Sequence, residues 1–113
     1  MRCDVQALAG RCVGRYGGGA TVLCPLAGAL ATRLDGRYHV QALLTLALTL
    51  AKRELPSLRG ADVLVDGSLS GLLPEIPSAA LVNVVAHALR LCVTTFGEDE
   101  TRRLVAEAWP DLR

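Results

Sequence analysis

The sequence predicts an all-α protein, a compact bundle of about five helices with an irregular connector around residues 57–77. Three observations lead to this prediction. Apolar residues recur along most of the chain with the i, i+3, i+4, i+7 spacing of an amphipathic helix. The longest apolar stretches are rich in Leu and Ala, which favour helix, and most glycines and prolines lie between these stretches. A chain of 113 residues has the usual length of one domain, so we expect residues 1–113 to form a single helical domain.

Two shorter helices are expected in the first third of the chain. One face of the first helix consists of Val5, Leu8, Ala9, Cys12 and Val13, and three glycines at 17–19 follow it. The second helix is expected to begin near Thr21, whose hydroxyl can cap it. Pro25 fits the first turn of this helix, because an N–H there has no helical partner to lose. The Asp-Gly pair at 35–36 is typical of a helix end.

A long third helix is expected at 38–55. This stretch is apolar around much of its circumference, which is typical of a central helix. Its polar stripe is narrow and consists of Gln41, Thr45, Thr49, Lys52 and Arg53. The alternating leucines within 44–50 also fit a strand, but the length of the stretch and its shortage of β-branched residues favour a helix.

The connector at 57–77 is the least regular part of the sequence. It contains Gly60, Gly67, Gly71, Pro74 and Pro77 around a short apolar run at 61–65. This run has the composition of a strand, but a strand needs a partner. An extended connector, or a single helical turn at 69–73, fits the sequence equally well.

The last third of the chain predicts two helices. The first is expected at 78–96, with Ser78 as its N-cap and Gly97 after its end. The second begins with three acidic residues at 98–100, which suit the positive end of the helix dipole.

Composition and charge exclude several classes of protein. The net charge of +1 gives no basic field for nucleic acid, so we expect no nucleic-acid partner. The longest charge-free stretches, at 16–32 and 38–51, are shorter than the roughly 20 apolar residues of a membrane span, so no span is expected. The amino terminus lacks the apolar run of a signal peptide, and we expect the protein in the cytoplasm.

No motif for catalysis, metal binding or cofactor binding is present. The cysteines and histidines are widely spaced, with no Cys-x-x-Cys pair: Cys3, Cys12, Cys24, Cys92, His39 and His87. We therefore expect no catalytic residues, no metal and no cofactor, with the thiols reduced and buried. This favours a protein that is not an enzyme.

Two groups of residues are candidates for an interaction site. The first is a polar edge on the fourth helix, formed at helical spacing by Asn83, His87, Arg90 and Thr94. Such a stripe is more often simply the solvated side of an amphipathic helix. The second is an apolar interface on the two long helices, formed by Leu44, Leu48, Val82, Leu89 and Val93. These helices are apolar over so much of their girth that a second buried face is expected.

Three classes of function remain compatible with the sequence. The first is a helical protein–protein interaction module, an adaptor or regulatory subunit, which pairs with itself as a homodimer or binds another protein. The alternative is a bundle that binds a small molecule or lipid between the long helices, where Thr45 and Thr49 could orient the ligand. A small thiol-dependent enzyme is the least favoured class.

Overall fold

The computed structural model describes residues 5–16, 19–34, 36–72 and 76–110, and within these it forms a compact bundle of five α-helices. The helices are α1 (Val5–Tyr16), α2 (Cys24–Ala31), α3 (Arg37–Glu54), α4 (Ser78–Phe96) and α5 (Glu98–Ala108). The predicted all-α bundle is therefore confirmed. A single turn of 3₁₀ helix, η1 (Pro56–Leu58), and a small hairpin of β1 (Asp62–Val63) and β2 (Leu69–Ser70) lie between α3 and α4.

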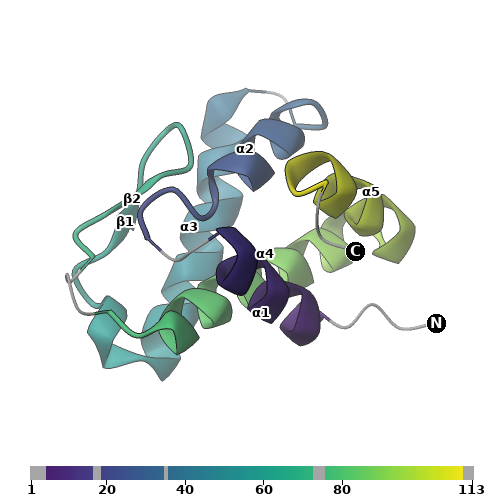
Figure 1. Ribbon diagram of the computed structural model, residues 1–113. Helices are drawn as coiled ribbons and strands as arrows, with labels where there is room; N and C mark the ends of the chain where they lie inside the picture. The colour runs from purple at the N-terminus through teal and green to yellow at the C-terminus, as the bar shows by residue number, and fades with distance from the viewer. Residues whose placement is uncertain (1–4, 17–18, 35, 73–75, 111–113) are drawn as a thin grey trace.

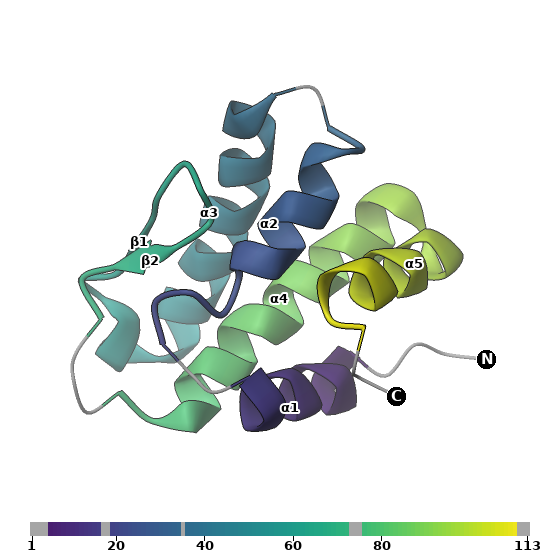
Figure 2. The ribbon, with the colours of Figure 1, turned by 45° about the horizontal axis from the view of Figure 1, so that its top comes forward.

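Helix α4 is the centre of the bundle. It packs against α3, α1 and α5, while α2 packs against α5 and α3 (Figures 1 and 2). Val84, Val85 and Ala86 are consecutive and all buried. Successive residues on a helix point 100° apart, so neighbours must cover α4 over most of its girth. The buried apolar residues of all five helices and the hairpin form one contiguous cluster.

The composition of α4 also meets the simplest criterion for a membrane span. Ser78–Phe96 has the length and hydropathy of a spanning helix, although the charge-free stretches considered in the sequence lie elsewhere. Eight of its residues are buried in the bundle, from Ala80 to Cys92. Burial against three other helices accounts for this apolar composition, because the core helix of a globular domain is selected for the same residue types.

Glycines mark two of the helix boundaries. Gly97 has a φ of 91° and sits between α4 and α5, where its N–H donates to the Val93 carbonyl and its carbonyl accepts from the Thr101 N–H and hydroxyl. Glycine adopts such positive φ values without steric cost. Gly36, with a φ of 90°, directly precedes α3.

Two predicted caps are not observed. Ser78 is the first residue of α4, preceded by Pro77, and makes no side-chain cap. Thr21 lies in a turn before α2, which begins three residues later at Cys24. The chain enters α2 through a backbone turn at 21–23, whereas it enters α4 from the extended Pro77.

The connector contains a strand pair that the sequence left open. β1 pairs antiparallel with β2, in the register Asp62 to Ser70 and Val63 to Leu69. The run at 61–65 thus finds its partner within the connector itself. The helical turn considered at 69–73 is wrong at Leu69 and Ser70, which are extended, and residue 73 lies outside the described residues.

Two close backbone approaches fix the hairpin to its surroundings. Gly67 has a φ of 87°, and a Cβ there would lie 2.4 Å from the Cβ of Ala27 on α2. Gly71 has a φ of 74°, and a Cβ there would lie 2.0 Å from the Gly60 carbonyl oxygen. Only glycine leaves room for these contacts, so the hairpin is a packed part of the fold rather than a free loop.

An ionic cluster joins α2 to α5. The Arg33 guanidinium donates two hydrogen bonds to the Glu107 carboxylate, at 2.9 and 3.0 Å, and a third to Glu100. These bonds hold the pKa of both carboxyls below its usual range, because they stabilise the ionised form. The cluster ties the end of α2 to the outer side of α5, and its role is structural.

Candidate interaction surface

The predicted apolar interface lies mostly in the core of the chain itself. Leu44, Leu48 and Leu89 are at most 2% exposed, while Val82 and Val93 are half-buried. The prediction is wrong for the three leucines, because α3 and α4 turn these side chains into the core that they share with their neighbours. A partner protein cannot reach them without unfolding the bundle.

The first half of the predicted polar edge holds α3 to α4. The Asn83 amide donates to one oxygen of the Glu54 carboxylate at 3.0 Å, and the His87 ring nitrogen Nε2 lies 2.9 Å from the other. The hydrogen bond from Asn83, followed by that from His87, lowers the pKa of Glu54. These side chains therefore fasten the end of α3 within the chain.

The second half of this edge faces α1 and solvent. Arg90 donates to the Gln6 side chain of α1 at 3.3 Å, and the Thr94 hydroxyl donates to the Arg90 carbonyl at 3.1 Å. Both Arg90 and Thr94 are exposed. The four residues share one line along α4, as the spacing predicted, but each of them already makes a side-chain contact within the chain.

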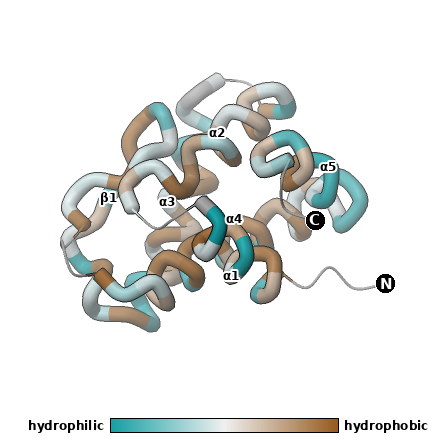
Figure 3. Tube along the Cα trace, viewed as in Figure 1, coloured by the Kyte–Doolittle hydropathy of each residue, from teal (hydrophilic) through white to brown (hydrophobic). Residues whose placement is uncertain are grey.

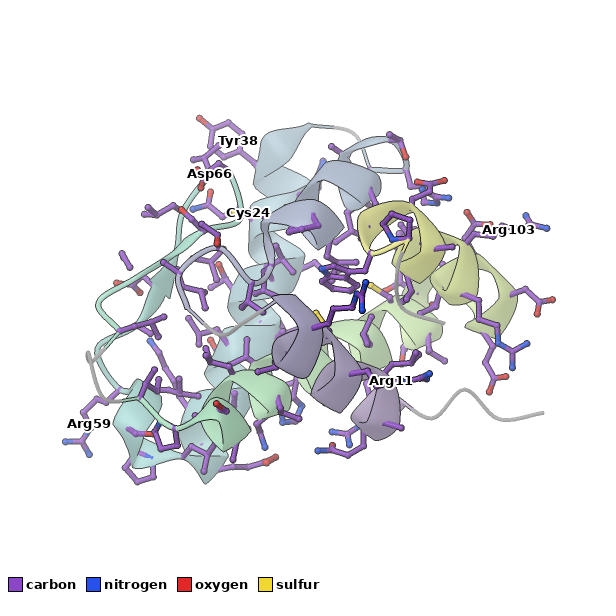
Figure 4. All side chains as sticks on the ribbon, in the orientation of Figure 1. Arg11, Cys24, Tyr38, Arg59, Asp66 and Arg103 are labelled. Carbon is purple, nitrogen blue, oxygen red and sulfur yellow. The ribbon has the colours of Figure 1, made fainter. Side chains whose placement is uncertain are left out.

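The large exposed hydrophobic side chains of the described residues gather on another side of the molecule. Tyr38 is 80% exposed and Leu46 is 49% exposed, and both belong to α3. Three small uncharged residues complete what we call the outer face of α3: Tyr38, Ala42, Thr45, Leu46 and Thr49, all exposed. With the neighbouring Gln41 they line an open hollow of about 450 Å³. In Figure 4 the Tyr38 side chain projects outward at the edge of the molecule.

The hairpin extends this surface. Its loop exposes Leu64 by 46% and Val65 by 43%. The loop lies beside α3, because the Gln41 amide donates to the Val63 carbonyl at 2.9 Å. Figure 3 shows hydrophilic residues concentrated on α5, at the other end of the molecule. The exposed hydrophobic side chains of the outer face of α3 and of the hairpin loop thus lie on two adjacent elements.

Sequence reasoning missed this surface although it recognised some of its residues. Thr45 and Thr49 were assigned to a polar stripe and to a ligand site between the long helices. They lie instead on the exposed side of α3, where the Thr49 hydroxyl donates to the Thr45 carbonyl at 2.9 Å. A hydroxyl that bonds its own helix presents mainly a methyl group to a partner. The signal in the sequence was the absence of charge between Tyr38 and Ala51.

A second hollow of about 290 Å³ lies between α2, α3 and the hairpin. It is lined by Cys24, Ala27, Gly28, Ala31, Val40, Val65 and Asp66, and Figure 4 labels Cys24 and Asp66 near its mouth. Burial, followed by the negative charge of Asp66, raises the pKa of the half-buried Cys24 thiol. This environment opposes formation of a thiolate and gives no support to a nucleophilic role.

The two other thiols in the described part of the chain are still less suited to chemistry. Cys12 and Cys92 are fully buried, and burial raises the pKa of each thiol to about 12. No group of three His, Cys, Asp or Glu side chains that could hold a metal ion occurs in the part of the chain that the structure describes. In comparisons with known proteins, no family model, no curated protein and no solved structure matches this chain.

Proposed function

We propose that this protein is a helical interaction module that self-associates through the outer face of α3 and the hairpin loop. One observation carries the proposal: the exposed large hydrophobic side chains of the described residues all lie on these two adjacent elements. Scattered exposed apolar residues need no explanation, whereas a contiguous group typically marks an interaction site. An adaptor or regulatory subunit is the class of protein that such a surface fits.

The charge of this surface favours a second copy as the partner. The five residues of the outer face are all uncharged, the hairpin loop adds one exposed carboxylate at Asp66, and the chain as a whole has a net charge of only +1. Two copies can therefore meet on the outer face of α3 without bringing like charges together. A closed two-fold pair is the commonest way for one chain to cover its own apolar patch.

Light scattering coupled to size exclusion tests this proposal. The unaltered chain should have the mass of a dimer at micromolar concentration. Leu46→Glu should give a monomer with unchanged helical circular dichroism, because Leu46 is half-exposed and its replacement leaves the core intact. Ala106→Glu, on an exposed position of α5 away from this surface, is the matched control and should remain a dimer. A monodisperse monomer of the unaltered chain would disprove the proposal.

The hollow beside Cys24 supports a second candidate function, the binding of a small apolar ligand. Its volume of about 290 Å³ is at the lower end of the range for ligand sites, and its walls are mainly Ala, Gly and Val. Gly28 lies on this wall, and a Cβ added there meets nothing within 4 Å, so this position is the place to introduce a larger side chain into the hollow. Native mass spectrometry should then detect a bound molecule in the unaltered chain and none in Gly28→Leu.

A further inference from the structure

Side-chain size alternates along the outer face of α3. Tyr38 stands at one end, Leu46 lies beyond the middle, and the positions between and after them are small. Thr49 marks the other end, eleven residues from Tyr38 and therefore about 16 Å along the helix axis at a rise of 1.5 Å per residue. A partner helix must place small side chains opposite Tyr38 and Leu46. It must place large side chains opposite the small residues of the outer face.

We infer that two copies pair α3 against α3 in antiparallel order, with Tyr38 of each copy over Thr49 of the other. This inference rests on the proposed self-association and specifies its geometry. In this register Ala42 lies level with Thr45 of the second copy along the helix axis, and Leu46 lies level with Gln41. Tyr38 of each copy then meets the smaller Thr49 of the other, and both copies use the same residues, as a two-fold axis requires.

Parallel pairing of the same face is much less favourable. It places each residue opposite its own copy, so Tyr38 meets Tyr38 and the exposed Arg53 meets Arg53. It also aligns the two helix dipoles, whereas antiparallel helices set their opposite ends side by side. In the antiparallel register Arg53 lies beyond the first residue of the opposite α3 and stays in water.

The hollow on α3 has a natural occupant in this arrangement. It lies between Tyr38 and Thr49 and measures about 450 Å³. The antiparallel register brings Tyr38 of the second copy to the Thr49 end of this hollow, and symmetry does the same in the other copy. An aromatic ring with a polar tip is the type of side chain that is enriched at protein interfaces.

The size of a stable interface explains the contribution of the hairpin loop. A standard interface buries about 800 Å² on each partner, roughly one eighth of the 6203 Å² surface of this chain. The outer face of α3 is only about 16 Å long, so residues beyond the helix are needed to reach an interface of that size. Leu64 and Val65, held beside α3 by Gln41, supply additional apolar contact on both sides of the pair.

Disulfide trapping tests this register in the chain of 113 residues. Cys3→Ser and Cys24→Ser are introduced first, so that the native thiols left are the buried Cys12 and Cys92. In this background a Tyr38→Cys chain is mixed with a Thr49→Cys chain and mildly oxidised. A disulfide forms when the two Cα atoms come within about 7 Å. The mixture should yield a heterodimer whose linked peptides join positions 38 and 49. At the other end of this heterodimer, Tyr38 of one chain still meets Thr49 of the other.

The controls separate failure of the register from failure of self-association. Each cysteine variant oxidised alone should give almost no linked dimer, because equal positions are about 16 Å apart along the antiparallel pair. Dimers linked 38 to 38 or 49 to 49 would show parallel pairing and overturn this inference alone. A dimer by light scattering that forms no link at either position would place the interface on another face and overturn it as well. If the background chain and the unaltered chain were both monomeric by light scattering, the proposed self-association itself would be refuted.

Discussion

At the scale of single residues, Cys24 shows how the fold sets the chemistry of a side chain. Its thiol is half-buried and lies near the Asp66 carboxylate, and both features raise its pKa. The carboxylate stays ionised because the Ser68 hydroxyl and N–H donate to it, at 2.6 and 2.9 Å, which lowers the pKa of Asp66. The hairpin turn therefore places a negative charge beside a thiol, which disfavours the reactive thiolate.

Asp66→Asn should increase the reactivity of Cys24. Asparagine keeps the oxygen that accepts from Ser68 but removes the charge, so the pKa of Cys24 falls and more thiolate is present at pH 8. We expect alkylation by iodoacetamide in a Cys3→Ser background to accelerate on the order of twofold to fivefold, since an exposed charge acts through water. Mass spectrometry of the Cys24 peptide measures the rate. Asp62→Asn, at the other end of the hairpin, is the control and should leave the rate unchanged.

At the scale of elements, the hairpin between α3 and α4 depends on its glycines. Gly71→Ala places a methyl group 2.0 Å from the Gly60 oxygen at a φ of 74°. We expect the free energy of unfolding to fall by about 1–3 kcal/mol, since both the clash and the left-handed backbone are unfavourable to alanine. Urea denaturation followed by circular dichroism measures the change.

A matched glycine provides the control for this change. Gly28 lies within α2 and has open space around it. Gly28→Ala should stabilise the protein by about 0.5–1 kcal/mol, because alanine is the better helix former and restricts the unfolded chain. Equal effects of the two substitutions would contradict the close contact between Gly71 and Gly60.

The link between α2 and α5 predicts a dependence of stability on pH. Arg33 lowers the pKa of Glu100 and of Glu107 in the folded state. Their contribution is therefore present above the pKa of an unfolded glutamate and is lost as pH falls through the lower folded values. In Glu100→Gln/Glu107→Gln, the melting temperature should fall less between pH 6 and pH 3 than in the unaltered chain. Glu98→Gln, whose 3.9 Å pair with Arg102 lies on the outside of α5, should keep the original slope.

At the scale of the whole molecule, the sequence predicted the helices better than their packing. The five helices follow from a spacing that is local, and so does the approximate position of each boundary. The strands of the hairpin are two residues each, too short for an alternating pattern. Their pairing depends instead on contacts with α2 and α3.

The interaction surface was missed for a related reason. Because α3 is apolar around most of its circumference, the sequence predicted that one of its apolar faces is free to bind a partner. Leu44 and Leu48 were assigned to that face. In the structure α3 packs against α4, α2, η1 and β1, which use that apolar girth. The face left over is the one with Ala and Thr among its residues, which a count of hydrophobic residues does not single out. Contacts between residues distant in sequence decide which helix covers which face. The local spacing of apolar residues does not reveal these contacts.

The distinction between core and surface on α3 predicts two different responses to substitution by alanine. Leu48 is 2% exposed, so Leu48→Ala should reduce the free energy of unfolding by about 2–5 kcal/mol. Leu46 is half-exposed, so Leu46→Ala should cost the isolated chain less than about 1 kcal/mol while weakening the proposed dimer.

Thermal unfolding over a hundredfold range of protein concentration separates the two responses. A dimer that dissociates on unfolding melts at a higher temperature as concentration rises, by several degrees over this range. Leu48→Ala should melt lower at every concentration and keep this rise, because it damages the core and leaves the outer face intact. Leu46→Ala should melt close to the unaltered chain at low concentration and lose most of the rise. If Leu46→Ala kept the full rise, the outer face of α3 would not be the surface on which two copies meet.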